Sequence, residues 1–250
     1  MIYCDAHCHL GSRYFEEDRE AMLKRMSESK VAKAIVICCS EHDLMIGKKL
    51  TDENPGFKLA MGIHPQDLEE HDFARFKHFK KLVAEYKPDM IGEVGLDYYS
   101  HPHTKTYQQE FFRKQLELAL EKDLPVDIHS RKAANDTLQI LKEYPIRGII
   151  HSYSGSIEMA RLYLKQGLYI SFGASVLFKG SHKPAEVIKQ IPLDRLLIET
   201  DAPYQSPIRD HRHEPCDILA IYEAIAKIRE METQELCRIV ENNFDRVFER

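Results

Sequence analysis

Two histidines near the start of the chain have the spacing of a metal site. His7 and His9 lie two residues apart, directly after a short apolar run that predicts a buried strand. Alternate side chains of an extended segment point to the same side, so both imidazoles face one point while Cys8 faces away. Two converging imidazoles suit a divalent transition metal. A His-x-His pair alone is more often a pair of surface histidines, so this interpretation depends on further ligands elsewhere in the chain.

Other metal-competent side chains stand at the ends of later apolar runs. They are His64, Glu93, His129, His151 and Asp201. With the first pair, they offer enough imidazoles and carboxylates for two divalent ions, one carboxylate bridging both. Two ions roughly 3.5–4 Å apart activate a water and stabilise the attacking and leaving oxygens of a displacement reaction. Mixed nitrogen and oxygen ligands favour Zn, Mn, Fe or Co, and Mg less well. We therefore expect up to two divalent metal ions per chain.

Alternating segments of two kinds predict the elements that position these residues. Short apolar runs rich in β-branched residues predict strands over residues 2–5, 34–38, 59–62, 90–93, 125–129, 148–151, 169–172 and 196–200. Longer amphipathic segments predict helices over residues 15–29, 73–86, 107–121, 133–143, 157–165, 184–190, 215–229 and 233–248. Eight βα units in a chain of 250 residues predict an α/β fold. We expect a single (β/α)8 TIM-type barrel over residues 1–250, with an extra C-terminal helix.

A doubly wound open sheet is the rival architecture. It would usually carry a glycine-rich phosphate-binding turn after its first strand, and residues 5–9 do not form one. In a barrel, function is located at the carboxyl ends of the strands. The candidate ligands stand at the ends of predicted strands, so their positions favour the barrel.

Composition limits the classes of partner and compartment. The net charge of -5 provides no global basic field, which argues against tight, sequence-independent nucleic-acid binding but not against a nuclease with a local basic patch. The six cysteines include no CxxC pair and predict reduced thiols in a cytoplasmic protein. No signal-peptide pattern and no apolar run of membrane length is present, so we expect no membrane association. No feature indicates an obligate protein partner.

Several motifs extend the pattern over nearly the whole chain. They are DAHCHL at 5–10, GIHP at 62–65, IGEVGLDYY at 91–99, IHSR at 128–131, HSYSG at 151–155 and PLDRLLIETDAPY at 192–204. On these motifs the chain resembles the TatD-type metal-dependent deoxyribonucleases and hydrolases of the amidohydrolase superfamily. The resemblance implies a TIM-type barrel that holds up to two ions.

The resemblance also implies a role for each ligand by matching position. The two N-terminal histidines and Asp201 would bind one ion, His129 and His151 would bind the other, and Glu93 would bridge them. Asp201 would also orient or deprotonate the nucleophilic water, as a carboxylate beside that water can. His64 would contact substrate or phosphate and is not a first-choice ligand. The catalytic residues are accordingly expected to be Asp201 and Glu93.

Further residues near the predicted mouth are candidate substrate contacts. Arg131 could bind a phosphate or carboxylate through its planar guanidinium, or form a salt bridge to a neighbouring loop. The loop containing Arg209 and His213 is locally basic and follows the eighth strand, where barrel enzymes often bind phosphate. Tyr98 could stack on a base or pack against the barrel rim. Asp97 could support a metal ligand or cap the following segment.

Three functions are compatible with these residues. The first is metal-dependent phosphodiester hydrolysis, and the resemblance points to DNA, as single strands or chain ends. The second is hydrolysis of a carboxyl ester or amide, including deacylation of aminoacyl-tRNA, because the same ions can polarise a carbonyl group. Arg131 fits a phosphate or a carboxylate, so the sequence does not separate these two. The third is a metal-binding accessory subunit of a larger complex, against which the intact ligand set argues.

Overall fold

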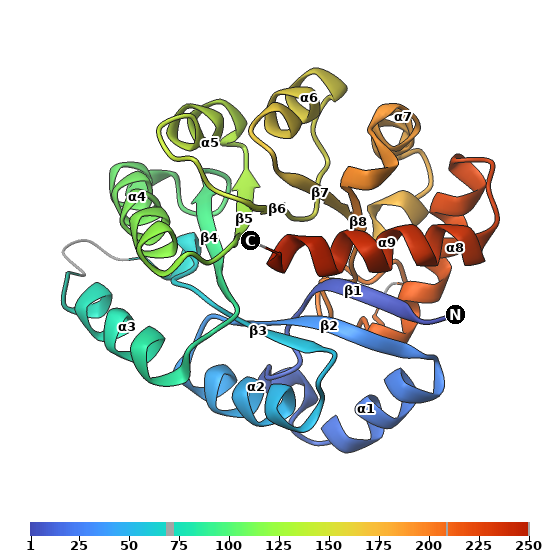
Figure 1. Ribbon diagram of the computed structural model, residues 1–250, viewed down its shortest axis with the longest axis horizontal. Helices are drawn as coiled ribbons and strands as arrows, with labels where there is room; N and C mark the ends of the chain where they lie inside the picture. Colours follow the sequence, from blue (N-terminus) through green and yellow to red (C-terminus); the bar gives the residue numbers. More distant parts are fainter. Residues whose placement is uncertain (69–72, 209, 250) are drawn as a thin grey trace.

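Eight parallel strands form one sheet in the order β1 to β8 in the computed structural model, which describes residues 1–68, 73–208 and 210–249 (Figure 1). The strands are β1 Tyr3–Cys8, β2 Val31–Cys38, β3 Phe57–Met61, β4 Met90–Asp97, β5 Val126–Arg131, β6 Gly148–Ile150, β7 Tyr169–Phe172 and β8 Leu196–Ile198. Each strand pairs with the next one along the chain. The predicted (β/α)8 barrel is therefore confirmed.

Helices surround this barrel (Figure 1). They are α1 Arg19–Glu28, α2 Glu41–Glu53, α3 Phe73–Tyr86, α4 Lys105–Lys122, α5 Ala134–Leu141, α6 Ile157–Lys165, α7 His182–Gln190, α8 Ile218–Ile228 and α9 Thr233–Phe248. The last of them, α9, packs against β1 and β8. Its Asn243 donates hydrogen bonds to the carbonyls of Leu193 and Leu196, at the amino end of β8. The predicted C-terminal helix therefore lies away from the carboxyl ends of the strands.

One helix, α2, was not expected from the sequence. Its apolar stripe is thin, and its central Gly47 is a poor helix former. The helix begins at a cap, where the Ser40 hydroxyl accepts a hydrogen bond from the Asp43 amide. A Cβ atom at Gly47 would lie 2.5 Å from the sulfur of Cys38 in β2. Glycine is therefore present because the helix approaches the strand closely, which the sequence alone does not reveal.

The two strands that carry the central ligands extend further than expected. β4 continues to Asp97 and β5 to Arg131, and they stay in register there, with Gly95 opposite His129. Gly95 has a φ of 141°, and a Cβ atom on it would lie 2.1 Å from the carbonyl oxygen of His129. Only glycine allows this approach, which keeps Glu93 of β4 beside the histidine of β5.

Hydrogen bonds close the barrel at the carboxyl ends of its first and last strands. The amide of Asp201 donates to the carbonyl of His7 at 2.9 Å, and the amide of His9 donates to the carbonyl of Ala202 at 2.8 Å. Residues almost 200 positions apart in the chain are thereby aligned. In the described part of the chain, none of the helices combines the length and hydrophobicity needed to cross a membrane.

Candidate metal centre

The first donor group lies where β1 meets the segment after β8. The Nε2 atoms of His7 and His9 are 3.2 Å apart, and Oδ1 of Asp201 lies 3.5 and 3.4 Å from them. All three side chains are buried. Asp201 adopts a φ of 61°, a conformation that is uncommon for a residue with a side chain and turns the chain sharply after β8. The barrel closure thus brings together the residues that the resemblance assigns to one ion.

Glu93 lies between this group and a second one. Its Oε1 atom is 2.7 Å from Nδ1 of His129 and 2.9 Å from Nε2 of His151. Its Oε2 atom is 3.6 Å from Nε2 of His7 and 3.8 Å from Nε2 of His9. Each carboxylate oxygen therefore faces a different pair of imidazoles. This geometry suits a bridging ligand, and the individual ligand roles stay predictions.

His64 lies closer to these donors than its predicted role in substrate binding requires. Its Nε2 atom is 3.2 Å from Oε1 of Glu93, within a possible donor group that includes His129. Its Nδ1 atom accepts a hydrogen bond from the Gln66 amide. The proton of the neutral ring is therefore on Nε2, where the imidazole donates a hydrogen bond. This arrangement suits a donor to a carboxylate or phosphate oxygen.

Buried carboxylates support three of the histidines from outside the centre. Asp127 Oδ1 lies 3.0 Å from His7 Nδ1, Glu199 Oε1 lies 3.4 Å from His151 Nδ1, and Asp97 Oδ2 lies 3.3 Å from His129 Nε2. Such partners orient a metal-binding imidazole and increase its basicity. Asp97 also accepts hydrogen bonds from the amides of Tyr99 and Ser100, so it caps the following segment and contacts a predicted metal ligand.

The roles of the other two carboxylates were not expected from the sequence. Asp127 and Glu199 each precede a candidate site residue by two positions, Asp127 within the same strand and Glu199 directly after β8. This spacing of two residues from a candidate site residue is the sequence feature that could have indicated both carboxylates.

The charges of the centre fit a cation site. Burial opposes ionisation of Glu93, but the imidazoles of His64 and His151 outweigh it and hold the pKa of that carboxyl well below its usual range. Burial likewise opposes the charge of Asp201, whose pKa is nevertheless lowered by the neighbouring imidazoles. Burial also opposes a charge on His151, but Glu93 and Glu199 outweigh it and raise the pKa of this imidazole, so a positive charge on the ring faces the carboxylates. Divalent ions would supply the same positive charge after the imidazoles lose their protons, so the donor set fits such ions.

Comparison with known proteins agrees with this geometry. A family model described as "TatD related DNase" matches residues 4–249. The chain belongs to the TatD family. It is 38% identical over 252 residues to a Bacillus subtilis protein named "Uncharacterized metal-dependent hydrolase YabD", with 98% of each chain covered. It is 32% identical over 263 residues to the "Putative deoxyribonuclease tatdn3" of Danio rerio, covering 99% of this chain and 97% of the relative.

A solved structure of another TatD homologue has the same fold. The crystal structure of YJJV from Escherichia coli K12 superposes with a TM-score of 0.91 at 27% identity, covering 99% of this chain and 98% of that one. An organophosphorus hydrolase from Deinococcus radiodurans shares the fold, with a TM-score of 0.68 at 13% identity. The family match and the similar relatives show that the protein is a metal-dependent hydrolase of the TatD family.

The Asp127 carboxylate, which contacts Nδ1 of His7, allows a test of the candidate metal centre. Asp127→Asn is expected to lower metal affinity by about 10–100-fold, because the Nδ1 proton loses its charged acceptor. Saturating metal should restore most of the activity. Activity would be measured against free metal concentration in chelator-buffered solutions. Asp245→Asn, at an exposed aspartate of α9, is the control, and the same metal dependence in both variants would contradict the assigned role.

The mouth above the centre is an open pocket of about 700 Å³. Its walls include Arg131, at the end of β5, and Tyr204, in the loop after β8. Arg131 is exposed, and its guanidinium carbon lies 4.2 Å from the centre of the Tyr99 ring. The structure thus places Arg131 where a bound anion could reach it. Arg131 therefore remains a predicted substrate contact of this TatD-family protein.

Two other predicted substrate contacts lie elsewhere. The prediction for His213 needs correction, because this residue is fully buried and its Nδ1 donates to the carbonyl of Tyr204. Tyr98 donates its hydroxyl to Asp136 and accepts from Gln109, so it turns toward α4 and α5 and is not among the described residues lining the mouth. Arg209 lies outside the described residues. Contacts with the loop of Tyr204 decided the position of His213, and contacts with α4 and α5 decided that of Tyr98; the sequence specified neither.

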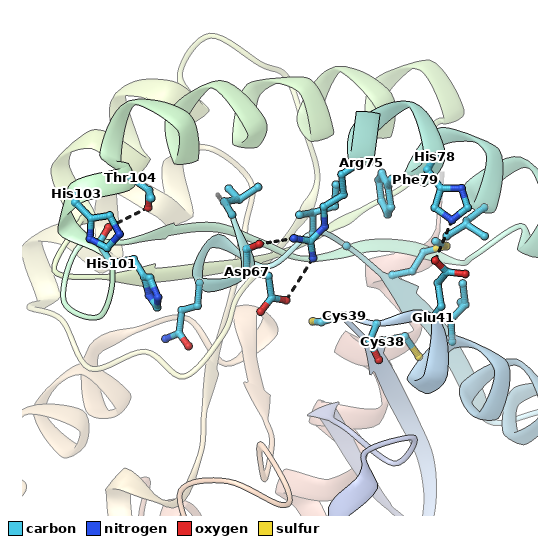
Figure 2. Close-up of a pocket in the computed structure, with 18 residues that line it drawn as sticks. Cys38, Cys39, Glu41, Asp67, Arg75, His78, Phe79, His101, His103 and Thr104 are labelled. Carbon is cyan, nitrogen blue, oxygen red and sulfur yellow. Dashed lines mark hydrogen bonds and ion pairs between the residues drawn. The ribbon is translucent and has the colours of Figure 1, made fainter. Parts of the chain in front are cut away.

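A second hollow adjoins the mouth and shares four lining residues with it. They are Cys39, Ser40, Gln66 and Asp67. Figure 2 shows that Arg75 bonds to Asp67 and that His78 pairs with Glu41 in this hollow. These polar side chains contact one another within the protein. The hollow therefore lies beside the mouth, and these paired side chains form part of its wall.

Proposed function

We propose that this TatD-family hydrolase cleaves phosphodiester bonds of DNA, as single strands or at chain ends. The observation that carries the proposal is Glu93, whose two oxygens face two separate donor groups at the floor of an open mouth. Arg131 at the rim offers a guanidinium for a phosphate. The family description and the name of the Danio rerio relative support a nuclease. In this proposal residues 1–250 act as one catalytic barrel.

The proposed ligand sets follow the two donor groups. One ion would be held by His7, His9 and Asp201, the other by His129 and His151, with Glu93 between them. Divalent ions bound there would lower the pKa of a water molecule and neutralise charge on the phosphate. Imidazole and carboxylate donors without a thiolate fit Zn, Mn, Fe or Co, and Mg less well.

Side chains near the metal centre have separate proposed roles in the reaction. Asp201 accepts a hydrogen bond from Gln205 at 2.5 Å, which fixes the carboxylate, and its lowered pKa keeps it ionised. It can therefore orient the attacking water and accept its proton. The Nε2 proton of His64 can hydrogen bond to a phosphate oxygen, and Arg131 can bind a neighbouring phosphate. With a net charge of -5, binding is expected to be modest and weakened by salt.

Metal removal and reloading tests the proposed function. Stripped protein should be inactive, and reloading singly with Mn, Zn or Mg should restore shortening of an end-labelled single-stranded DNA with at least one of these ions. An aminoacyl ester is assayed in parallel, with the Asp201→Asn variant as the blank for both substrates. Ester turnover without DNA shortening would contradict the nuclease proposal in favour of a carboxyl-ester hydrolase. Bound metal without turnover of either substrate would favour an accessory subunit.

The thiol chemistry suggests where this hydrolase acts. All six cysteines are free, including buried Cys4, Cys8, Cys38 and Cys237. Free thiols of this number suit a reducing compartment. We propose a cytoplasmic location, with nucleic acid as the substrate and without an obligate protein partner.

A further inference from the structure

Exposed apolar side chains gather around the mouth of the barrel. Nine large hydrophobic side chains of the described residues are exposed, and five of them lie in the segments that follow β1, β4, β7 or β8 at their carboxyl ends. These five are Tyr14, Tyr99, Phe178, Tyr204 and Ile208. Exposed apolar groups that cluster at one end of a protein mark a binding surface. The candidate metal centre lies at the same end.

Two of these residues, Tyr204 and Tyr14, form a pair of neighbouring rings that leads outward from the candidate metal centre. We call this pair the step. The Tyr204 ring centre lies 5.2 Å from that of His9, with the ring planes at 80°. The Tyr14 ring centre lies 5.9 Å from that of Tyr204, with the planes at 81°. Tyr204 is 45% exposed and Tyr14 is 66% exposed. An aromatic surface therefore continues from a candidate ligand into solvent.

Two consecutive residues of the loop before α8 hold this step in place. His213 Nδ1 donates to the carbonyl of Tyr204 at 3.0 Å, and Arg212 Nη1 donates to the carbonyl of Tyr14 at 2.7 Å. The amide of Tyr204 also donates to the carbonyl of Asp201 at 2.7 Å. Arg212 is itself fixed by charged hydrogen bonds to Asp18. The rings are thus exposed on a fixed backbone, which lowers the entropic cost of binding a ligand.

We propose that Tyr204 and Tyr14 stack on bases of a single-stranded nucleic acid whose phosphodiester lies at the metal centre. This inference rests on the proposed function and names what the same site recognises beside the phosphate. Every base has an aromatic face, so stacking gives affinity without sequence preference. The net charge of -5 leaves little general attraction for a polyanion, so the rings supply affinity that charge does not. A small carboxyl ester would leave both rings unused.

The step and Arg131 lie on different sides of the mouth. Tyr14 and Tyr204 follow β1 and β8, whereas Arg131 ends β5, four strands away from β1 in the eight-stranded order. In a closed barrel of eight strands, that separation corresponds to opposite sides. Bases on one side of the cleaved bond would stack on the tyrosines, and a phosphate on the other side would reach Arg131.

Base-dependent cleavage tests the step. A labelled single-stranded DNA is compared with a matched strand that has abasic residues around the cleavage position, using the metal-loaded protein. Stacking on an aromatic side chain corresponds to about 5–150-fold per base, so Tyr204→Ala should lower kcat/KM on the intact strand about 10-fold, mainly through KM. On the abasic strand it should change kcat/KM less than 2-fold. Tyr14→Ala should have a smaller effect of the same kind.

Two control variants separate stacking from other roles. Tyr204→Phe keeps the ring and should keep the preference for the intact strand, which a function of the hydroxyl group would abolish. Leu162→Ala removes an exposed apolar side chain, 37% exposed, that lies on α6 outside this surface and does not line the mouth. Its kinetics should match those of the unaltered protein on both strands.

The outcomes distinguish this inference from the proposed function. The unaltered protein could cleave DNA while Tyr204→Ala lowers kcat/KM equally on both strands or on neither. That result would overturn the proposed stacking and leave the proposed nuclease activity intact. No cleavage by the unaltered protein would contradict the proposed function. Equilibrium binding of the two strands to Asp201→Asn protein, followed by fluorescence anisotropy, would then decide the step, and equal affinity for both strands would overturn it.

Discussion

Asp201→Asn is expected to reduce turnover by about 10²–10⁴-fold, the range that a general base contributes, while the fold and most bound metal remain. An asparagine has nearly the same shape and retains a carbonyl oxygen that can face His7 and His9, as Oδ1 does now. It cannot accept a proton from the attacking water. Because Asp201 is ionised and fixed by Gln205, removal of its charge should affect the reaction more than the structure.

The measurement for this variant combines kinetics with two controls of integrity. Turnover of single-stranded DNA is compared with metal content by mass spectrometry and with the thermal unfolding midpoint. Asp194→Asn provides the matched substitution, because this exposed aspartate lies before the amino end of the same strand, β8. A rate within a few fold of the unaltered protein would exclude Asp201 as the base.

Glu93→Ala is expected to lose both bound metal and activity. No other residue of the described centre has its two oxygens facing two donor groups, so its removal should weaken both ion sites. Loss of supporting contacts alone lowers metal affinity by 10–100-fold, and loss of a direct bridging ligand should exceed about 100-fold. Turnover should fall by a similar factor or more at limiting metal.

Metal stoichiometry after dialysis measures this effect directly. We expect fewer than one tightly bound ion per chain in Glu93→Ala, and Glu93→Gln should be intermediate because one oxygen is kept. Glu121→Ala, at an exposed residue of α4, serves as the control. Full occupancy of two ions in Glu93→Ala would show that the carboxylate does not bridge them. A native unfolding transition in each variant excludes loss of fold as the cause.

The sequence by itself determined the fold class and the side chains that form the candidate metal centre. Regular alternation of apolar runs and amphipathic segments predicted the barrel, because each period reports a local backbone geometry. The candidate ligands stood at or near the ends of those runs, and a parallel barrel collects such ends at one face. The motifs around His7, Glu93 and Asp201 then predicted the TatD family, which the family match confirmed.

The tertiary structure alone decided which side chains share a contact. Hydrogen bonds across the closure between β1 and β8 align His7 with Asp201, and close approach of β4 and β5 at Gly95 keeps Glu93 beside its histidines. Burial of His213 against the loop of Tyr204 removed one predicted substrate contact. These positions depend on strand register and packing between segments far apart in the chain. Local periodicity carries no information about them, which is why they became visible only in the folded protein.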